Sequence, residues 1–199
     1  MPRRSIADIR REEIIDAFYS VVSKKGFTKA TTREIAKAAG CRHGLLHHYF
    51  ANKEEIVQGF VEYVSNEYLA ELEEGISKEM TATDRLEFMH SYVGKLSRFT
   101  LDFCRAWVEC WALGNSHPAV SRALNRCYRK MRKILIEVIQ DGMEAGEFRT
   151  VDPTIAANLI LSTSEGTTML WVVNTKDWPV ESVNRHVAEF CLSYLKKER

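Results

Sequence analysis

The sequence predicts an all-α protein that carries a helix-turn-helix motif near its N-terminus. Apolar residues recur at helical spacing along the chain of 199 residues, and no segment shows the alternating pattern of a β-strand. Residues 31–50 combine two short helical patterns with a glycine turn between them. A hydrophobic content of 45% and a charged content of 28% are typical of a globular protein with a sizeable core.

The first helix of the motif has a recognisable beginning and end. Thr31 followed by Glu34 forms a capping box, in which each side chain satisfies a free backbone N–H at the helix start. Ile35 and Ala36 start a short apolar stripe, and the small Ala36 stands where a second helix must cross closely. Gly40 then ends the helix, because glycine adopts the left-handed conformation at no steric cost.

The second helix, roughly Arg42–Phe50, has one apolar face and one face that suits nucleic acid. Leu46, Tyr49 and Phe50 share one side at helical spacing and are expected to pack on the first helix. The opposite side carries small, basic and imidazole residues that approach or donate to base edges and phosphates. Lys53 opens a further helix, whose free N–H groups favour a phosphate. The predicted DNA-binding residues are Thr31, Thr32, Arg33, Arg42, His43, Gly44, Leu45, His47, His48 and Lys53.

Beyond residue 55 the chain is predicted to be helical throughout. A long helix over about 53–75 precedes helices over roughly 83–100, 102–115, 119–145, 153–175 and 180–196. Pro118, Gly146, Pro153 and Pro179 mark the breaks between them. No glycine- or proline-rich linker follows residue 55, so the parts on either side are expected to be mechanically coupled.

Charge is distributed unevenly along the chain, although its net value is only +1. Residues 1–55 contain 11 Lys and Arg against 7 Asp and Glu, whereas the other residues contain 17 against 20. Such an excess attracts nucleic acid. The basic residues near the motif include Arg3, Arg4, Arg10, Arg11, Lys24, Lys25 and Lys29. Five cysteines without paired spacing, and no apolar targeting segment at the N-terminus, indicate a reduced, cytoplasmic protein.

Residues 9–63 resemble the DNA-binding domain of the TetR family of one-component bacterial regulators. The matching segments are KKGFTKATTREIAKAAG, GLLHHYF and NKEEIVQGF. Family members usually carry a small hydroxyl residue in place of Leu45 and a tyrosine in place of His47. The resemblance implies a three-helix DNA-binding head over 1–55, with its motif at about 31–50. It also implies a helical-bundle body over 56–199 that binds an effector and forms a homodimer.

The resemblance further implies that the last two helices form a four-helix dimer interface. The residues expected there are Ile155, Leu159, Val173, Val187, Phe190, Cys191 and Tyr194. Within the family, the run RAWVECWALGNSHPAVSRALNRCYRKMRKIL is similar to choline-responsive repressors of the betaine pathway. This second similarity rests on the paired tryptophans and on the pattern from proline to arginine that follows them.

Two features of the body are candidates for an effector site. Phe103, Trp107 and Trp111 follow one another at four-residue intervals, as an aromatic core or a ligand-binding face would. Glu165 is the one charged residue in the apolar segment 153–175, so it needs a partner where it is buried. An Arg or a hydroxyl from a symmetry mate is one such partner. The other is a cationic amine such as choline, held by Glu165 together with Trp107, Trp111 and Trp171.

The predicted function is that of a DNA-binding transcriptional regulator, in the first place a repressor released from a palindromic operator by a small-molecule effector. The alternatives are an all-helical enzyme or carrier, and an architectural DNA-binding protein without an effector. No nucleophile motif, P-loop or dinucleotide-binding glycine pattern is present, so neither catalysis nor a cofactor is predicted. His43 and His47 have the spacing of a metal pair but lack an acidic or cysteine third ligand, so no metal site is predicted.

Overall fold

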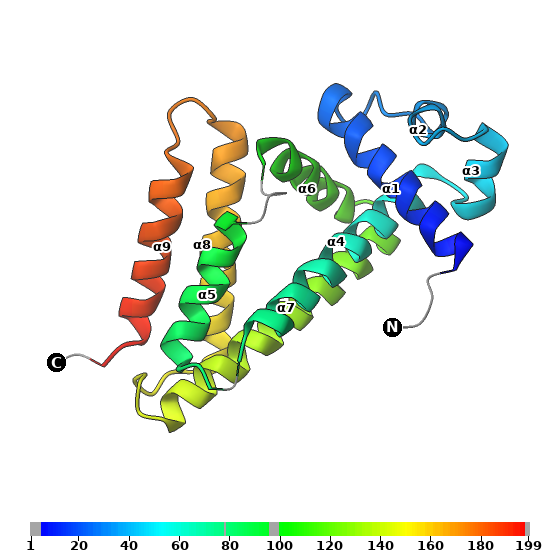
Figure 1. Cartoon of the computed structure of the whole chain (residues 1–199). Coiled ribbons are helices and arrows are strands. Elements are labelled where there is room, and N and C mark those ends of the chain that lie inside the picture. Colours follow the sequence, from blue (N-terminus) through cyan, green and yellow to red (C-terminus); the bar gives the residue numbers. More distant parts are fainter. Residues whose placement is uncertain (1–4, 78, 96–99, 198–199) are drawn as a thin grey trace. The chain divides into compact units, whose positions relative to one another are not determined.

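The computed structural model describes residues 5–77, 79–95 and 100–197, and these residues form nine α-helices (Figure 1). The prediction of an all-α fold is confirmed: within the described residues, the only β-type pairing is an isolated bridge between Phe148 and Lys196. Across the same residues, no helix has both the length and the apolar character needed to cross a membrane. The helices are α1 (Ile6–Lys25), α2 (Thr32–Ala38), α3 (His43–Tyr49), α4 (Lys53–Gly75), α5 (Ala82–Lys95), α6 (Leu101–Gly114), α7 (Pro118–Glu144), α8 (Pro153–Val173) and α9 (Val180–Leu195).

The helix boundaries lie close to those that the sequence predicts. Pro118 and Pro153 each occupy the first position of a helix, where the missing N–H of proline costs no hydrogen bond. Asp152 caps α8 by accepting hydrogen bonds from two backbone amides of its first turn. The expected extension of α5 to residue 100 includes residues 96–99, which lie outside the described part of the chain, as do Arg3 and Arg4.

The helices form two compact units, and each unit is assembled from separate stretches of the chain. The first unit takes the chain up to Asn66 together with Arg105–Cys127, and the second takes Glu67–Cys104 and the chain from Tyr128 onward. Three helices, α4, α6 and α7, therefore contribute residues to both units. The units do not coincide with the division expected at residue 55, because part of the predicted body packs with the head.

The first unit has an aromatic core that fixes the small N-terminal helices. The Phe18 ring of α1 lies 5.6 Å from the Phe60 ring of α4 and 6.5 Å from the Phe27 ring, measured between ring centroids. Leu46 of α3 and Phe50 after it are almost completely buried. Gly40 has a φ of +64°, as the turn between α2 and α3 requires. The predicted helix-turn-helix is thus present and is held against α1 and α4.

The second unit is a helical bundle in which α5 and α8 both pack on α9 (Figure 1). Its core contains Leu72, Leu86, Ile139, Phe148, Ile160 and Leu195, all with less than 5% of their surface exposed. Glu147, in the loop after α7, caps the start of α5 from 65 residues away. Its carboxylate accepts hydrogen bonds from the backbone N–H groups of Ala82 at 2.9 Å and of Thr83 at 3.0 Å. Partial burial opposes ionisation of Glu147, but these hydrogen bonds outweigh it and lower the pKa of the carboxyl group.

Candidate nucleic-acid interface

The start of α2 is fixed by its own capping box and by α1. The hydroxyl of Thr31 accepts from the Glu34 amide at 3.2 Å, and the Glu34 carboxylate accepts from the Thr31 amide at 3.3 Å. Lys25, in the last turn of α1, donates to the same carboxylate at 2.5 Å. This hydrogen bond from Lys25, followed by that from Thr31, lowers the pKa of Glu34. With Ile35 fully buried, Arg33 is left exposed beside the cap.

Helix α3 has the two faces that the sequence predicts. Leu46 is fully buried and Phe50 is 1% exposed, so the apolar side packs into the head. Leu45 remains 43% exposed on the opposite side of the helix. An exposed leucine among polar groups suits contact with the methyl group of a thymine. The exposed residues of this face are Arg42, Gly44, Leu45, His47 and His48.

Arg11 of α1 holds the end of α3, a contact that the sequence analysis missed. Its guanidinium donates to the backbone carbonyl of Tyr49 at 2.6 Å and lies 4.2 Å from the centre of the Phe50 ring. The carbonyl groups at a helix end lack partners within the helix, so a cation there satisfies one of them. Arg11 therefore fixes the orientation of α3 instead of serving only as part of a general positive charge.

Lys53 begins α4, as predicted, but its ammonium group is turned toward its own chain. It donates to the carbonyl of Phe27 at 2.9 Å and lies 3.7 Å from the centre of the Phe27 ring. Partial burial lowers the pKa of Lys53. This contact anchors the loop between α1 and α2. An ammonium group has three donors, so a phosphate contact by Lys53 stays a prediction.

His43 and His47 belong to a chain of hydrogen-bonding groups that crosses the motif. The Nε2 atom of His43 lies 3.0 Å from the hydroxyl oxygen of Thr32 on α2 and 3.2 Å from Nε2 of His47. The Nδ1 atom of His47 in turn lies 3.2 Å from the carbonyl oxygen of Ala51. The two rings are nearly perpendicular, with their centroids 4.5 Å apart. Among the described residues, no group of three or more potential ligands forms a metal site here or elsewhere.

The residues predicted for the effector site fall in both units. Trp107 is almost buried and Trp111 half-buried on α6, and both belong to the first unit. Phe103, Glu165 and Trp171 are half-buried and belong to the second unit. A single site formed by all five therefore stays a prediction.

Within the second unit, Glu165 of α8 lies close to the first turn of α6. Burial raises the pKa of the Cys104 thiol to about 12, and the negative charge of Glu165 adds to this increase. Cys104 is the immediate neighbour of Phe103. The carboxylate of Glu165 thus lies near the beginning of the aromatic stripe on α6, close enough for its negative charge to affect the buried Cys104 thiol.

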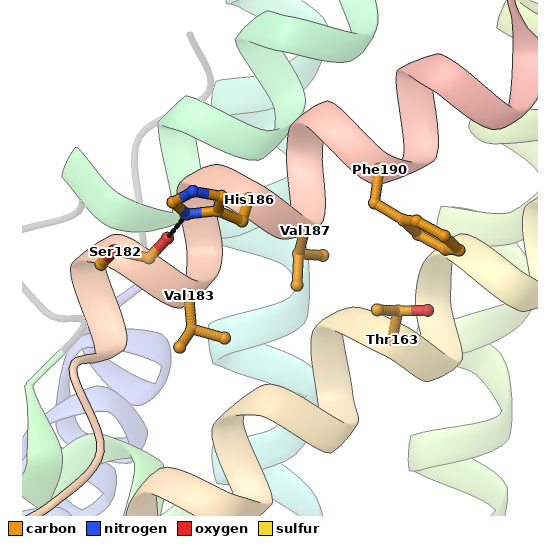
Figure 2. A pocket seen from close by; sticks show the side chains of 6 residues that line it. All are labelled: Thr163, Ser182, Val183, His186, Val187 and Phe190. Carbon is orange, nitrogen blue, oxygen red and sulfur yellow. Dashed lines mark hydrogen bonds between the residues drawn. The ribbon is translucent and has the colours of Figure 1, made fainter.

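A line of large apolar side chains on α8 and α9 is exposed to solvent. Val173 exposes 79% of its surface and Phe190 exposes 64%. Ile155, Leu159, Met169 and Leu170 on α8 are also exposed. Figure 2 shows a groove between the two helices on this side, where the side chains of Thr163, Ser182, Val183, His186, Val187 and Phe190 line it.

Three of the residues expected in the dimer interface pack within their own chain: Val187, Cys191 and Tyr194. Cys191 is 4% exposed and packs in the core of the second unit, so it is not available to a partner. Cys191 directly follows Phe190 in the sequence, so the two side chains point in different directions from α9. Cys191 points into the core of the second unit, and Phe190 points into solvent. Tyr194 is half-buried, and its ring lies 4.5 Å from the Arg149 guanidinium.

Two family profiles match the chain, one over the helix-turn-helix and one over the C-terminal helices. Residues 14–59 match the sequence profile of bacterial regulatory proteins of the tetR family, and residues 82–196 match that of the C-terminal region of BetI-type transcriptional repressors. The chain is 26% identical over 182 residues to the fatty acid metabolism regulator protein of Bacillus subtilis, covering 91% of this chain and 93% of that protein.

Solved structures show the same fold. The crystal structure of FadR from Bacillus subtilis in complex with stearoyl-CoA superposes with a TM-score of 0.80 at 25% identity, covering 92% of this chain and 98% of that one. A transcriptional regulator from Saccharomonospora viridis in complex with choline gives a TM-score of 0.85 at 16% identity, covering 94% and 98%. With the helix-turn-helix, the exposed face of α3 and a matching profile over more than half of its length, this chain belongs to the tetR family of bacterial transcriptional regulators, with a body of the BetI-type repressor class.

Proposed function

We propose that this protein is a cytoplasmic, homodimeric repressor that leaves a palindromic operator when a small-molecule effector binds. The observation that carries the proposal is the exposed face of α3, which is held rigidly by contacts from α1. Arg11 contacts the end of α3 and Lys25 contacts the start of α2, so α1 supports both helices of the motif. A recognition helix that is already ordered loses little conformational freedom when it enters a major groove.

Among the exposed residues of the motif, we expect Arg42 to discriminate most clearly between DNA base pairs. It is exposed immediately before α3, and the N-terminal residues of a recognition helix contact base edges. Replacing Arg42 by alanine should cost roughly 1–3 kcal/mol of binding free energy and relax the preference at one base pair. Gel shifts with every operator position varied provide the test, and Arg185→Ala on the exposed face of α9 removes the same charge as a control. Equal weakening on all sequences would instead assign Arg42 to a phosphate.

The exposed apolar surface of α8 and α9 supports the proposed homodimer. Ile155, Leu159, Val173 and Phe190 are large apolar side chains that expose about half or more of their surface, as residues of an interface do before a partner covers them. Two copies related by a two-fold axis would cover this surface with the same surface of the partner. A dimer of this kind presents two α3 helices, which is what a palindromic operator requires.

For the effector we propose a cationic amine, with choline as the first candidate. Glu165 supplies a half-buried negative charge in the second unit, near Cys104 and therefore near the Phe103 end of α6. A quaternary ammonium group gains both from a carboxylate and from the faces of aromatic rings. Trp107 and Trp111 continue the aromatic stripe on the same helix, and Trp171 lies on the helix of Glu165.

A long-chain acyl-CoA is a second candidate, because the Bacillus subtilis FadR structure contains stearoyl-CoA and this chain is 25% identical to it. Glu165→Gln separates the two effectors. The variant should weaken choline binding at least tenfold, whereas an anionic acyl-CoA should bind equally well or better. Calorimetry with choline and with stearoyl-CoA measures this, with Glu189→Gln on the exposed surface of α9 as the matched control. Choline binding that is unaffected by Glu165→Gln would contradict the assignment.

Release from DNA imposes a further condition on the effector. A ligand shifts an equilibrium only if it binds one conformation better than the other. Adding the correct effector must therefore lower operator affinity, and adding the operator must lower effector affinity by the same factor. Operator affinity is measured with and without the ligand, and ligand affinity with and without the operator. Equal changes in the two affinities show that the ligand regulates DNA binding.

A further inference from the structure

Thr32, His43, His47 and the carbonyl of Ala51 form a continuous hydrogen-bonded line, which we call the histidine relay. Nε2 of His43 meets both the Thr32 hydroxyl on the first turn of α2 and Nε2 of His47. The line then crosses the His47 ring to its Nδ1 atom and ends at the Ala51 carbonyl before α4. Three of the four ring nitrogens are thus directed at neighbours within the protein. The fourth, Nδ1 of His43, is the ring nitrogen left for an outside partner.

The chemistry of the relay determines where the protons lie. A carbonyl oxygen only accepts, so the Nδ1 atom of His47 that faces Ala51 must carry a hydrogen. In a neutral ring the Nε2 atom of His47 is then a bare acceptor. Nε2 of His43 faces this acceptor at 3.2 Å and the Thr32 hydroxyl oxygen at 3.0 Å. We assign the hydrogen to Nε2 of His43, because a hydroxyl oxygen can accept from it whereas two bare ring nitrogens repel each other. The neutral pair consequently has no hydrogen on Nδ1 of His43, and the lone pair there would repel a phosphate.

One added proton changes this in a defined way. Whichever ring takes it, the two facing Nε2 atoms share one hydrogen, and hydrogens occupy both Nδ1 atoms. The protonated pair carries a positive charge, and an N–H of His43 is directed away from the relay. That form is suited to a phosphate oxygen, because hydrogen bonds between ionised partners are the strong ones.

We propose that the histidine relay is a proton-dependent phosphate contact, in which His43 touches the DNA backbone and His47 is the positioning residue that fixes its protonation. The proposal rests on the proposed function, since it assigns a role within operator binding. It predicts that each half-site takes up one proton on binding. Operator affinity should therefore fall as the pH rises, and the fall should depend on His43.

The carboxylates on the elements around the relay are engaged elsewhere. On α2, Glu34 is held by Lys25 and by Thr31. At the start of α4, Glu55 accepts from the Ala51 amide at 2.8 Å, and Glu54 lies 3.7 Å from His117. Helix α1 also packs on α2 and α3, and on it Asp8 takes part in the N-terminal capping box, Glu13 pairs with Arg10, and Arg11 meets the Tyr49 carbonyl. The other charged groups and histidines on α1, on the two helices of the motif and at the start of α4 are Glu12, Asp16, Lys24, Arg33, Lys37, Arg42, His48 and Lys53. A proton on the pair therefore gains its counter-charge from DNA, which links protonation to binding.

The protonation pattern can be measured in the free full-length protein. A ¹⁵N–¹H correlation of the imidazole rings at about pH 8, where histidine is ordinarily neutral, reports which nitrogen carries hydrogen. We expect His47 with hydrogen on Nδ1 and His43 with hydrogen on Nε2. A spectrum in which His47 carries its hydrogen on Nε2 overturns the relay, whatever the protein does with DNA.

Operator binding provides the second measurement, with the tightest duplex that the wild-type protein recovers from a randomised pool as the probe. Between about pH 6 and pH 8 the dissociation constant should rise by up to tenfold per pH unit for each half-site. His43→Gln keeps an amide donor but cannot be protonated, so its binding should persist with a flat pH profile. His90→Gln, which replaces a histidine of α5 in the second unit, should retain the wild-type slope.

Each departure from this pattern has a clear meaning. A wild-type protein with a flat profile, or a His43→Gln variant with an undiminished slope, overturns the proton-dependent contact while leaving DNA binding intact. Loss of the pH dependence in His90→Gln assigns that dependence to a histidine outside the relay and also overturns the proposal. A protein that recovers no duplex at any pH refutes the proposed function itself. Replacing His47 by phenylalanine should alter the pH profile more than the affinity at about pH 6, because His47 acts only through His43.

Discussion

Phe190 tests the proposed dimer most directly, because its side chain projects from α9 while its neighbours hold the fold together. The residue exposes 64% of its surface in the single chain. A phenylalanine carries about 200 Å² of surface, so a partner would bury about 130 Å² per ring. At about 25 cal/mol per Å², this is worth about 3 kcal/mol per protomer. Alanine keeps about a third of that area, and each substitution counts twice in a two-fold interface. Phe190→Ala should therefore weaken the dimer by about 4 kcal/mol, or about a thousandfold in dissociation constant.

Sedimentation equilibrium over a range of protein concentrations measures this change. Phe190→Leu is the matched control, because it keeps most of the apolar area and should dissociate far less. Folding should be unaffected, since an exposed side chain contributes little to the core, and circular dichroism with a thermal melt verifies this. Phe190→Ala that remains dimeric at the wild-type concentration would place the interface on another surface. An unfolded variant would show that Phe190 has a packing role within the protomer that its exposure does not indicate.

Two further substitutions test contacts of the described structure. Glu147→Gln replaces a carboxylate that caps α5 by an amide, and we expect a loss of about 1 kcal/mol, or about 2–4 °C in melting temperature at neutral pH. Because the pKa of Glu147 is lowered in the folded protein, this stabilisation is present above the ordinary value of 4.5 and is lost as the pH falls below it. Thermal melts should accordingly converge in acid, and a difference that persists there would argue against the cap. Lys53→Ala should lower the melting temperature, because the Phe27 carbonyl loses its donor, and should reduce the salt dependence of operator binding by about one unit per half-site if the ammonium group also meets a phosphate. A lower melting temperature with an unchanged salt dependence would make Lys53 an anchor alone.

The helices were predictable because their signals are local. The capping box of Thr31 and Glu34, the turn at Gly40 and the cap at Asp152 each lie within a few residues of the structure they determine. The buried and exposed faces of α3 were predictable for the same reason, since helical spacing alone separates Leu46 from Leu45.

The contacts that fix the motif were not predictable from spacing. Arg11 meets Tyr49 from 38 residues away, Lys53 meets Phe27 from 26, and Glu147 meets Ala82 from 65. No periodicity in a single sequence links such positions, because it is the tertiary fold that brings them together. The same limit explains why Cys191 was wrongly predicted to lie in the dimer interface. A stripe of apolar residues on α9 identifies a face, but its inner and outer edges differ only by a small rotation of the helix.

The assembly of the first unit from two stretches of sequence bears on how such proteins can be recombined. A fragment that stops at Asn66 contains the whole helix-turn-helix, yet it lacks Arg105–Cys127, whose buried side chains complete the same unit. Arg126, which pairs with Glu62 of α4, would be lost as well. Exchanging DNA specificity between relatives by joining chains at one crossover point would therefore leave an apolar face uncovered. A functional chimaera has to carry both stretches from the same parent, or to adapt the surface where they meet.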